Sequence, residues 1–145
     1  IILSLTACTT GPGKKPSTLQ WKTYSDDQAI AFPAASWTKG PFQYALTKVE
    51  TTRRYTVLET TSRGLRFHIS IQNTAAGEAD VFAGMPKASL WLSDGAKIDK
   101  LVWTAAKVKI APGEATTGMY FNDGSLDEGV RPVKLLIDGQ PVAAW

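Results

Sequence analysis

Leu65-Arg66-Phe67-His68-Ile69-Ser70-Ile71-Gln72 is the stretch that decides the fold, because apolar and polar residues alternate along its whole length. A period of two places successive side chains on opposite faces of a β-strand, and it is typical of a strand with one buried face. The expected buried face carries Leu65, Phe67, Ile69 and Ile71. The expected outer face carries Arg66, His68, Ser70 and Gln72.

Strand-like segments continue on both sides of this stretch. Before it, residues 26–41 predict a short strand and irregular chain, and residues 42–47 and 54–61 predict two strands. After it, residues 73–78 predict a turn. Further strands are then expected over residues 88–92, 115–121 and 133–137, with residues 142–145 as an added edge. The dipeptides Asp94-Gly95, Pro112-Gly113 and Asp138-Gly139 mark tight turns between them.

Residues 98–110 are ambiguous between helix and strand. Ile98, Leu101, Val102 and Ala105 have helical spacing, whereas Lys107-Val108-Lys109-Ile110 alternates as a strand does. We favour strands, because the neighbouring segments are strands and Trp103-Thr104 interrupts the helical pattern.

Eight or nine short strands with frequent turns predict an all-β fold, either an antiparallel sandwich or a barrel, and the sandwich is favoured. From residue 65 onward the pattern resembles the immunoglobulin-like domains of unknown function in small bacterial lipoproteins. The similar pieces are Ile69-Ser70-Ile71-Gln72-Asn73-Thr74, Leu90-Trp91-Leu92-Ser93-Asp94-Gly95, Ala111-Pro112-Gly113-Glu114, Thr117-Gly118-Met119-Tyr120-Phe121 and Val133-Lys134-Leu135-Leu136-Ile137-Asp138-Gly139. The resemblance covers about half of the chain and leaves residues 19–60 outside; it implies an immunoglobulin-like antiparallel β-sandwich.

Leu5-Thr6-Ala7-Cys8 ends an apolar run near the start of the chain. An apolar segment followed by small residues is typical of a secretory signal peptide. The four residues resemble a bacterial lipobox, which implies cleavage after Ala7 and acylation of Cys8. Thr9 resembles the sorting pattern for an outer membrane. The alternatives are a plain secretory signal and a buried structural cysteine.

Three parts of the chain follow from this interpretation. Residues 1–7 are the remainder of a signal peptide, residues 8–18 are a lipidated cysteine and a Gly/Pro-rich linker, and residues 19–145 form the β-sandwich domain. Acyl chains would hold the protein at a membrane without a spanning helix. The expected location is the cell envelope, at an outer membrane and facing the periplasm.

The charge and cysteine content narrow the possible partners. The net charge is +3, and the basic residues are spread along the chain rather than gathered on one face, so nucleic acid is not expected as a partner. The single cysteine supplies no disulfide or zinc framework. We expect no cofactor.

Three arrangements of residues are candidates for a reactive or metal-binding site. His68 is the only histidine and lies beside Ser70, but a nucleophile needs its base within hydrogen-bond reach, and an exposed sheet histidine is the favoured interpretation. The polar loop 122–129 gathers oxygen donors without the spacing of a calcium loop, so a solvated turn is favoured over a metal site. No pair of the 13 acidic residues stands out as a glycosidase pair.

The tryptophans are the stronger indication of a binding surface. They are Trp21, Trp37, Trp91, Trp103 and Trp145. Trp91 lies between Leu90 and Leu92, so it faces outward if the leucines face the core. An exposed aromatic side chain can mark a partner surface or a sugar platform. The alternative is that Trp91 is covered by the N-terminal segment.

The sequence therefore predicts a non-enzymatic, lipid-anchored envelope protein that binds another protein, as an accessory or structural subunit of an assembly. Trp91, Arg66 and His68 are the candidate surface residues. The alternative is a module that binds carbohydrate, either peptidoglycan or a surface glycan. A hydrolase is the third possibility.

Overall fold

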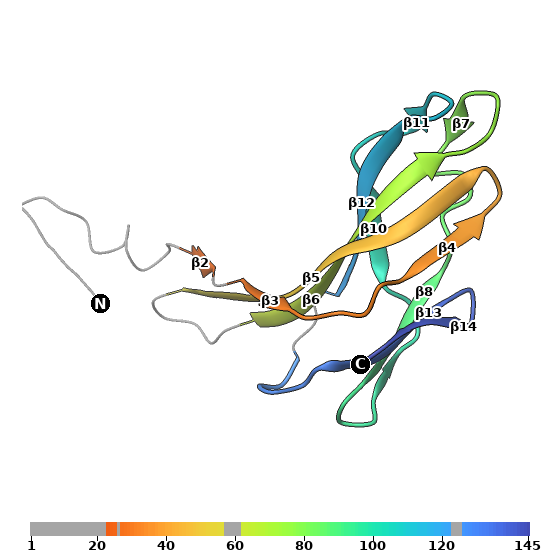
Figure 1. Ribbon diagram of the computed structural model, residues 1–145. Helices are drawn as coiled ribbons and strands as arrows, with labels where there is room; N and C mark the ends of the chain where they lie inside the picture. The colour runs from red at the N-terminus through yellow and green to blue at the C-terminus, as the bar shows by residue number, and fades with distance from the viewer. Residues whose placement is uncertain (1–22, 26, 57–61, 123–125) are drawn as a thin grey trace, which may run out of the picture.

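The computed structural model describes residues 23–25, 27–56, 62–122 and 126–145. Over these residues the fold is all-β, with antiparallel sheets and no helix, in a sandwich-like arrangement (Figure 1). The strands are β2 (Thr23–Ser25), β3 (Gln28–Ile30), β4 (Ser36–Lys39), β5 (Phe42–Thr56), β6 (Ser62–Asn73), β7 (Ala79–Asp80), β8 (Ala88–Leu92), β9 (Lys97–Ile98), β10 (Val102–Ala105), β11 (Lys109–Ile110), β12 (Ala115–Asn122), β13 (Pro132–Ile137) and β14 (Gln140–Ala144).

Two main sheets share one core. The large sheet has the order β10-β12-β6-β5, and β2, β3 and β4 pair one after another with β5. The small sheet has the order β14-β13-β8-β9, and β7 and β11 form a separate two-stranded ribbon. The chain crosses from the large sheet to the small one after β6, returns for β10 and β12, and crosses again for β13 and β14 (Figure 1).

The alternation that begins at Leu65 is confirmed. Leu65, Phe67, Ile69 and Ile71 are all buried, and they pack in one cluster with the inward residues of the small sheet, among them Leu90 and Leu135. Burial of a large apolar side chain contributes about 1.5–3 kcal/mol. This shared cluster is what holds the two sheets together.

Residues 42–56 form one strand, so the prediction of two separate strands over 42–47 and 54–61 is wrong for the part that the structure describes. The pairing of β5 with β6 shifts register between Leu46 and Lys48, because Thr47 is an extra residue. This β-bulge changes the phase of the alternation, so Leu46 and Val49 both face the core. Residues 57–61 lie outside the described residues. Residues 28–56 belong to the large sheet, although the family resemblance did not reach them.

Residues 98–110 contain β9, β10 and β11, which confirms the preference for strands over a helix. Leu101 does not follow the strand alternation, because it lies in the connection where the chain crosses from the small sheet to the large one. There its side chain is buried, and its N–H donates to the carbonyl of Ala88. The turn at Asp94-Gly95 joins β8 to β9, with Gly95 at a φ of +87°. The strand over 133–137 and the C-terminal edge strand are also confirmed, as β13 and β14.

Two details of the outer strands differ from a simple alternation. Val133 is exposed although Leu135 and Ile137 are buried, because a second bulge lies between Pro132 and Lys134. In β12 the buried positions are Thr116, Gly118 and Tyr120. A Cβ on Gly118 would lie 2.9 Å from Cδ1 of Ile71 on β6 and 3.1 Å from the carbonyl oxygen of Thr104 on β10. Glycine at this position of β12 therefore permits the close approach of both neighbouring strands.

Two tyrosines, Tyr44 and Tyr120, are fully buried in the core. The Tyr120 hydroxyl donates to the carbonyl of Pro86 at 2.5 Å, whereas the buried Tyr44 hydroxyl has no hydrogen-bond partner among the described residues. Burial raises the pKa of Tyr44 to about 12, with a further contribution from the Asp138 carboxylate, and burial also raises the pKa of Tyr120. Nearby, Lys39 pairs with Asp138 at 2.9 Å, which links β4 to the β13–β14 turn.

Candidate binding surfaces

Trp91 lies on the outer face of the small sheet. Its neighbours Leu90 and Leu92 are buried in the core, so the alternation of β8 directs Trp91 outward, and 39% of its surface is exposed. The prediction that Trp91 faces outward is therefore confirmed.

Two lysines flank the Trp91 ring. Lys134 on β13 and Lys97 on β9 are the residues directly opposite Trp91 on its two neighbouring strands. The Lys97 ammonium lies 5.4 Å from the ring centroid, which is within the range of a cation–π interaction. We call Trp91, Lys97 and Lys134 the aromatic surface. It combines an apolar platform with two positive charges, and Asp99 lies 3.9 Å from Lys97 at its border.

The remaining described tryptophans serve the fold. Trp37 stacks on Tyr44 with 5.8 Å between the ring centroids, and Trp103 meets Phe82 at 4.9 Å. Trp145 packs its edge against Phe67 and donates its indole N–H to the carbonyl of Ala31. Trp21 lies outside the described residues. Of the four described tryptophans, Trp91 is the one with a sheet face rather than a ring partner beneath it.

His68 is not the freely exposed histidine that the sequence suggested. Its Nε2 lies 2.6 Å from Oε2 of Glu50, a side chain that is 8% exposed on the neighbouring strand. Lys48 lies 3.5 Å from the other carboxylate oxygen. This grouping could not be seen in the sequence, because the Thr47 bulge determines which residues of β5 lie beside β6.

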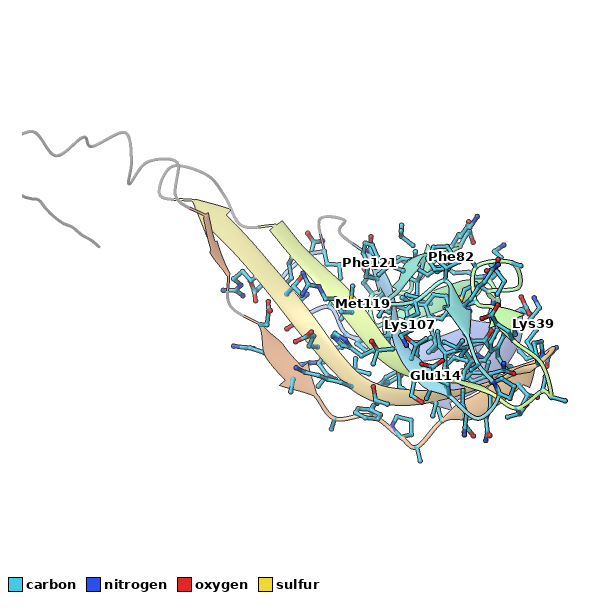
Figure 2. The ribbon with its side chains drawn as sticks, turned by 90° about the horizontal axis from the view of Figure 1, so that it is seen from above. Lys39, Phe82, Lys107, Glu114, Met119 and Phe121 are labelled. Carbon is cyan, nitrogen blue, oxygen red and sulfur yellow. The ribbon has the colours of Figure 1, made fainter. Side chains whose placement is uncertain are left out.

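The surroundings of His68 do not form a nucleophile–base pair. Ser70 shares its outer face, but none of the hydrogen bonds among the described residues joins Ser70 to the imidazole. A shallow hollow of about 250 Å³ adjoins the ring, lined in part by Thr104, Thr117 and Met119. In Figure 2 Met119 and Phe121 lie along β12, on the flank of the large sheet.

Arg66 belongs to the same outer face as His68. It is the direct neighbour of Glu50 on β5 and of Phe121 on β12, and its guanidinium lies 4.0 Å from the Asp27 carboxylate. Its side chain is 20% exposed. A pair at this distance and exposure contributes little to stability.

The three surface residues proposed from the sequence do not form one surface. Arg66 and His68 point away from the core on the large sheet, and Trp91 points away from the same core on the small sheet. They therefore lie on opposite sides of the sandwich-like fold, and one compact partner surface cannot touch all three. The sequence alone does not show that these residues lie on opposite sides, because that depends on where the chain crosses from one sheet to the other.

The described residues of the polar loop 122–129 contribute to packing. The carbonyls of Asp127 and Val130 accept hydrogen bonds from Arg63 at 2.7 and 3.0 Å, and the Glu128 carboxylate pairs with Arg53. Residues 123–125 lie outside the described residues. Within the described ranges, no group of three or more His, Cys, Asp or Glu side chains is placed to hold a metal ion.

A second kind of site, which the sequence did not predict, lies between residues 128–131 and the β3–β5–β6 part of the large sheet. It is a cavity of about 100 Å³ whose lining includes Arg53, Arg63, Arg131, Glu128 and Thr51. We call it the arginine cavity. The arginines are far apart in the sequence, so spacing gives no motif. The one available signal was that Arg63 falls in phase with the buried side chains of β6, whereas the Thr47 bulge conceals the phase of Arg53 on β5.

Cys8 and the other residues that resemble a lipobox lie outside the described residues. Among the residues that are described, no helix is present that is long and apolar enough to cross a membrane. Searches of protein-family models, of curated proteins and of solved structures find no significant match to this chain.

Proposed function

We propose that this chain is a lipid-anchored cell-envelope protein that binds another envelope protein through the aromatic surface. The observation that carries the binding role is the exposure of Trp91 on an ordered sheet face between Lys97 and Lys134. The lipobox residues Leu5 to Cys8 supply the argument for the anchor. An outer membrane, with the domain in the periplasm, is the location that fits Thr9 after the cysteine.

The physical argument for a protein partner begins with the order of the platform. Trp91 offers a large contact area at a small entropic cost, because the Lys97 ammonium already lies over its ring. Tryptophans of this kind often contribute most of the binding free energy at an interface. The two lysines would favour a partner with acidic groups around an apolar centre. A rigid sheet face with these properties suits an accessory or structural subunit.

The immunoglobulin-like class is part of the proposal. The order β5-β6-β12-β10 in one sheet and β14-β13-β8 in the other matches the A-B-E-D and G-F-C arrangement of that class. In this assignment β2, β3 and β4 are additions along strand A. Such folds present faces, edges and loops to partners, and the fold alone does not imply an activity.

The surroundings of His68 favour binding over hydrolysis. Nε2 of His68 is engaged by Glu50, and the described hydrogen bonds bring no hydroxyl to the ring. Replacement of His68 by Ala should therefore leave the biological activity intact. Complete loss of activity in a stable His68→Ala protein would contradict the non-enzymatic proposal.

Carbohydrate binding is the second candidate, and the same tryptophan supports it. An exposed indole ring on a sheet face can stack against the apolar face of a sugar when the Lys97 side chain moves away from it. Purified peptidoglycan in a sedimentation assay would distinguish the two. Protein that sediments with glycan in a Trp91-dependent manner would favour the carbohydrate module over the protein partner.

The test uses full-length, acylated protein in intact cells, with a photo-cross-linking amino acid at Lys134 or, as a control, at Ser70 on the opposite face. We expect one dominant protein partner from position 134 and none from position 70. Trp91→Ala should remove that cross-link without lowering the melting temperature appreciably. Phe82→Ala is the matched control, because Phe82 is also an exposed aromatic, at 44%.

Two results would contradict the proposal. Equal cross-linking from both faces, or cross-links only to abundant neighbours, would argue against a specific interface at Trp91. For the anchor, mass spectrometry of the mature protein should find acylated Cys8 at the N-terminus. Residues 1–7 still attached to an unmodified Cys8 would overturn the lipid-anchored part.

A further inference from the structure

The arginine cavity has an unusual charge arrangement. Arg53 and Arg63 are directly opposite each other on β5 and β6, so two like charges share one face of the sheet. Like charges in this position destabilise a sheet unless something neutralises them. Arg131 lines the same cavity from the loop before β13. Three arginines and one acidic residue, Glu128, therefore line the same cavity.

Arg63 carries a buried positive charge. Its side chain is buried, and its two terminal nitrogens donate to the carbonyls of Asp127 and Val130. Within the described part of the chain, no carboxylate forms an ion pair with Arg63 or with Arg131, while Glu128 pairs with Arg53. A buried charge without an opposite charge is costly. An anion in the cavity would remove that cost.

We infer that the arginine cavity binds the phosphate group of a ligand, held between the guanidinium groups of Arg53, Arg63 and Arg131. Guanidinium groups match phosphate oxygens with paired hydrogen bonds, and the interaction is stronger than one with a neutral group. A phosphate group carries about −1.5 to −2 charges at neutral pH, which balances the three arginines after Glu128 is counted. A single carboxylate would leave a positive charge unbalanced.

The size and the lining of the cavity are compatible with this ligand. Its volume of about 100 Å³ is several times the space that a single water needs, so a phosphate group and water can share it. Thr51 and Gln28 add polar groups to the lining. The Glu128 side chain is 73% exposed, so it can move away from Arg53 when a competing anion arrives.

This inference goes beyond the proposed protein partner, and it concerns a different part of the molecule. The aromatic surface is on the outer face of the small sheet, whereas the arginine cavity opens beside β3 and the inner face of the β5–β6 ribbon. The phosphate could belong to a soluble molecule or to a lipid headgroup. The two sources share one chemistry, and the experiment separates them.

The test uses the full chain with Cys8→Ser, so that acylation does not itself cause membrane binding. Inorganic phosphate is titrated by calorimetry at constant ionic strength, and vesicles that contain phosphatidic acid, whose headgroup is a phosphate monoester, are tested by co-sedimentation. Saturable binding in either arm is expected. Phosphate alone would indicate a soluble source, and vesicles alone a headgroup.

Two variants with opposite expected effects make the test specific. Arg131→Gln should weaken binding about tenfold, because it removes a charge-assisted hydrogen bond. Glu128→Gln should strengthen binding, because it removes the competing carboxylate. Lys109→Gln on β11 and Glu78→Gln make the same charge changes at exposed positions outside the cavity lining, and both should leave affinity within about twofold.

The inference is overturned if neither probe binds saturably, or if each variant changes affinity only as much as its charge-matched control. The second result would mean that net charge, rather than the cavity, attracts the anion. Loss of phosphate binding would leave the Trp91 cross-link unchanged, so failure here and failure of the proposed function are distinguishable.

Discussion

The two ends of the β5–β6 ribbon have the same backbone pairing and opposite chemistry on their inner face. At one end the inward side chains are Tyr44, Ile69 and Phe67, which pack against the small sheet; at the other they are Arg53 and Arg63, which meet the loop before β13. Figure 2 shows the ribbon curving away from the body of the molecule. The comparison teaches that strand alternation decides which side chains face inward, while the residue type decides whether they form a core or a polar cavity.

The largest expected effect is at the apolar end. Phe67 is fully buried and contacts the edge of the Trp145 ring. Phe67→Ala should lower the free energy of unfolding by about 3–5 kcal/mol, because it removes apolar contacts and leaves a cavity. Chemical denaturation measures this change. Phe82→Ala, at an exposed ring, should cost within about 1 kcal/mol, and a similar cost for both would remove the distinction between core and surface.

At the cationic end, Arg63→Met should lower the free energy of unfolding by about 2 kcal/mol. Methionine keeps the apolar stem but leaves the carbonyls of Asp127 and Val130 without their donors. Arg66→Met is the matched control on the outer face of the same strand and should cost less than about 1 kcal/mol. An Arg63→Met protein that is as stable as the unaltered chain would show that the guanidinium does not hold the loop.

The two buried tyrosines provide a finer comparison within the apolar end. Tyr120→Phe should cost about 1 kcal/mol, because the carbonyl of Pro86 loses its hydrogen-bond donor. Tyr44→Phe should be neutral or slightly stabilising, since its hydroxyl is buried without a partner among the described residues. Thermal denaturation of both variants measures the difference. A large loss for Tyr44→Phe would reveal a hydrogen bond to a bound water.

The smallest expected effect is at the surface pair that borders the tyrosines. The hydrogen bond from Lys39 holds the pKa of Asp138 below its ordinary value. Its stabilisation is therefore fully present above the ordinary pKa of about 4 and is lost as the pH falls through the lowered native pKa. Both side chains are more than two-fifths exposed, so the contribution is less than about 1 kcal/mol.

Asp138→Asn tests this pair with little change in shape. Asparagine tolerates the positive φ of 49° at this turn, so the substitution mainly removes the charge. Urea denaturation should find the variant less stable at neutral pH and equal to the unaltered chain in acid. A deficit that persists in acid would mean that the turn, and not the ion pair, was disturbed.

The sequence was informative where one strand's own pattern decides the structure. The buried face from Leu65 to Ile71, the outward position of Trp91 and the turn at Asp94-Gly95 all follow from local alternation and turn chemistry. The same reasoning failed at the bulges. Thr47 interrupts the period of two, so the single strand β5 reads as two strands in the sequence, and a second bulge leaves Val133 exposed within the predicted strand 133–137.

The binding sites depended on information that no single strand carries. The contact of His68 with Glu50 depends on the register of two strands around a bulge, and the opposite placement of Trp91 and His68 depends on how the chain crosses between the sheets. The arginine cavity needs residues from β5, β6 and a loop. In the sequence these arginines looked like dispersed surface charge.

The pairing of one edge of β5 with three short strands, rather than one long strand, has a consequence for aggregation. A strand of 15 residues with a free edge would offer a long template to the strands of other chains. Here that edge is covered by β2, β3 and β4, none longer than four residues, and Phe32 and Pro33 lie in the connection between the last two. Short, offset segments give an incoming strand little regular backbone to extend. At high local concentration, this would help to keep neighbouring copies from joining edge to edge into fibrils.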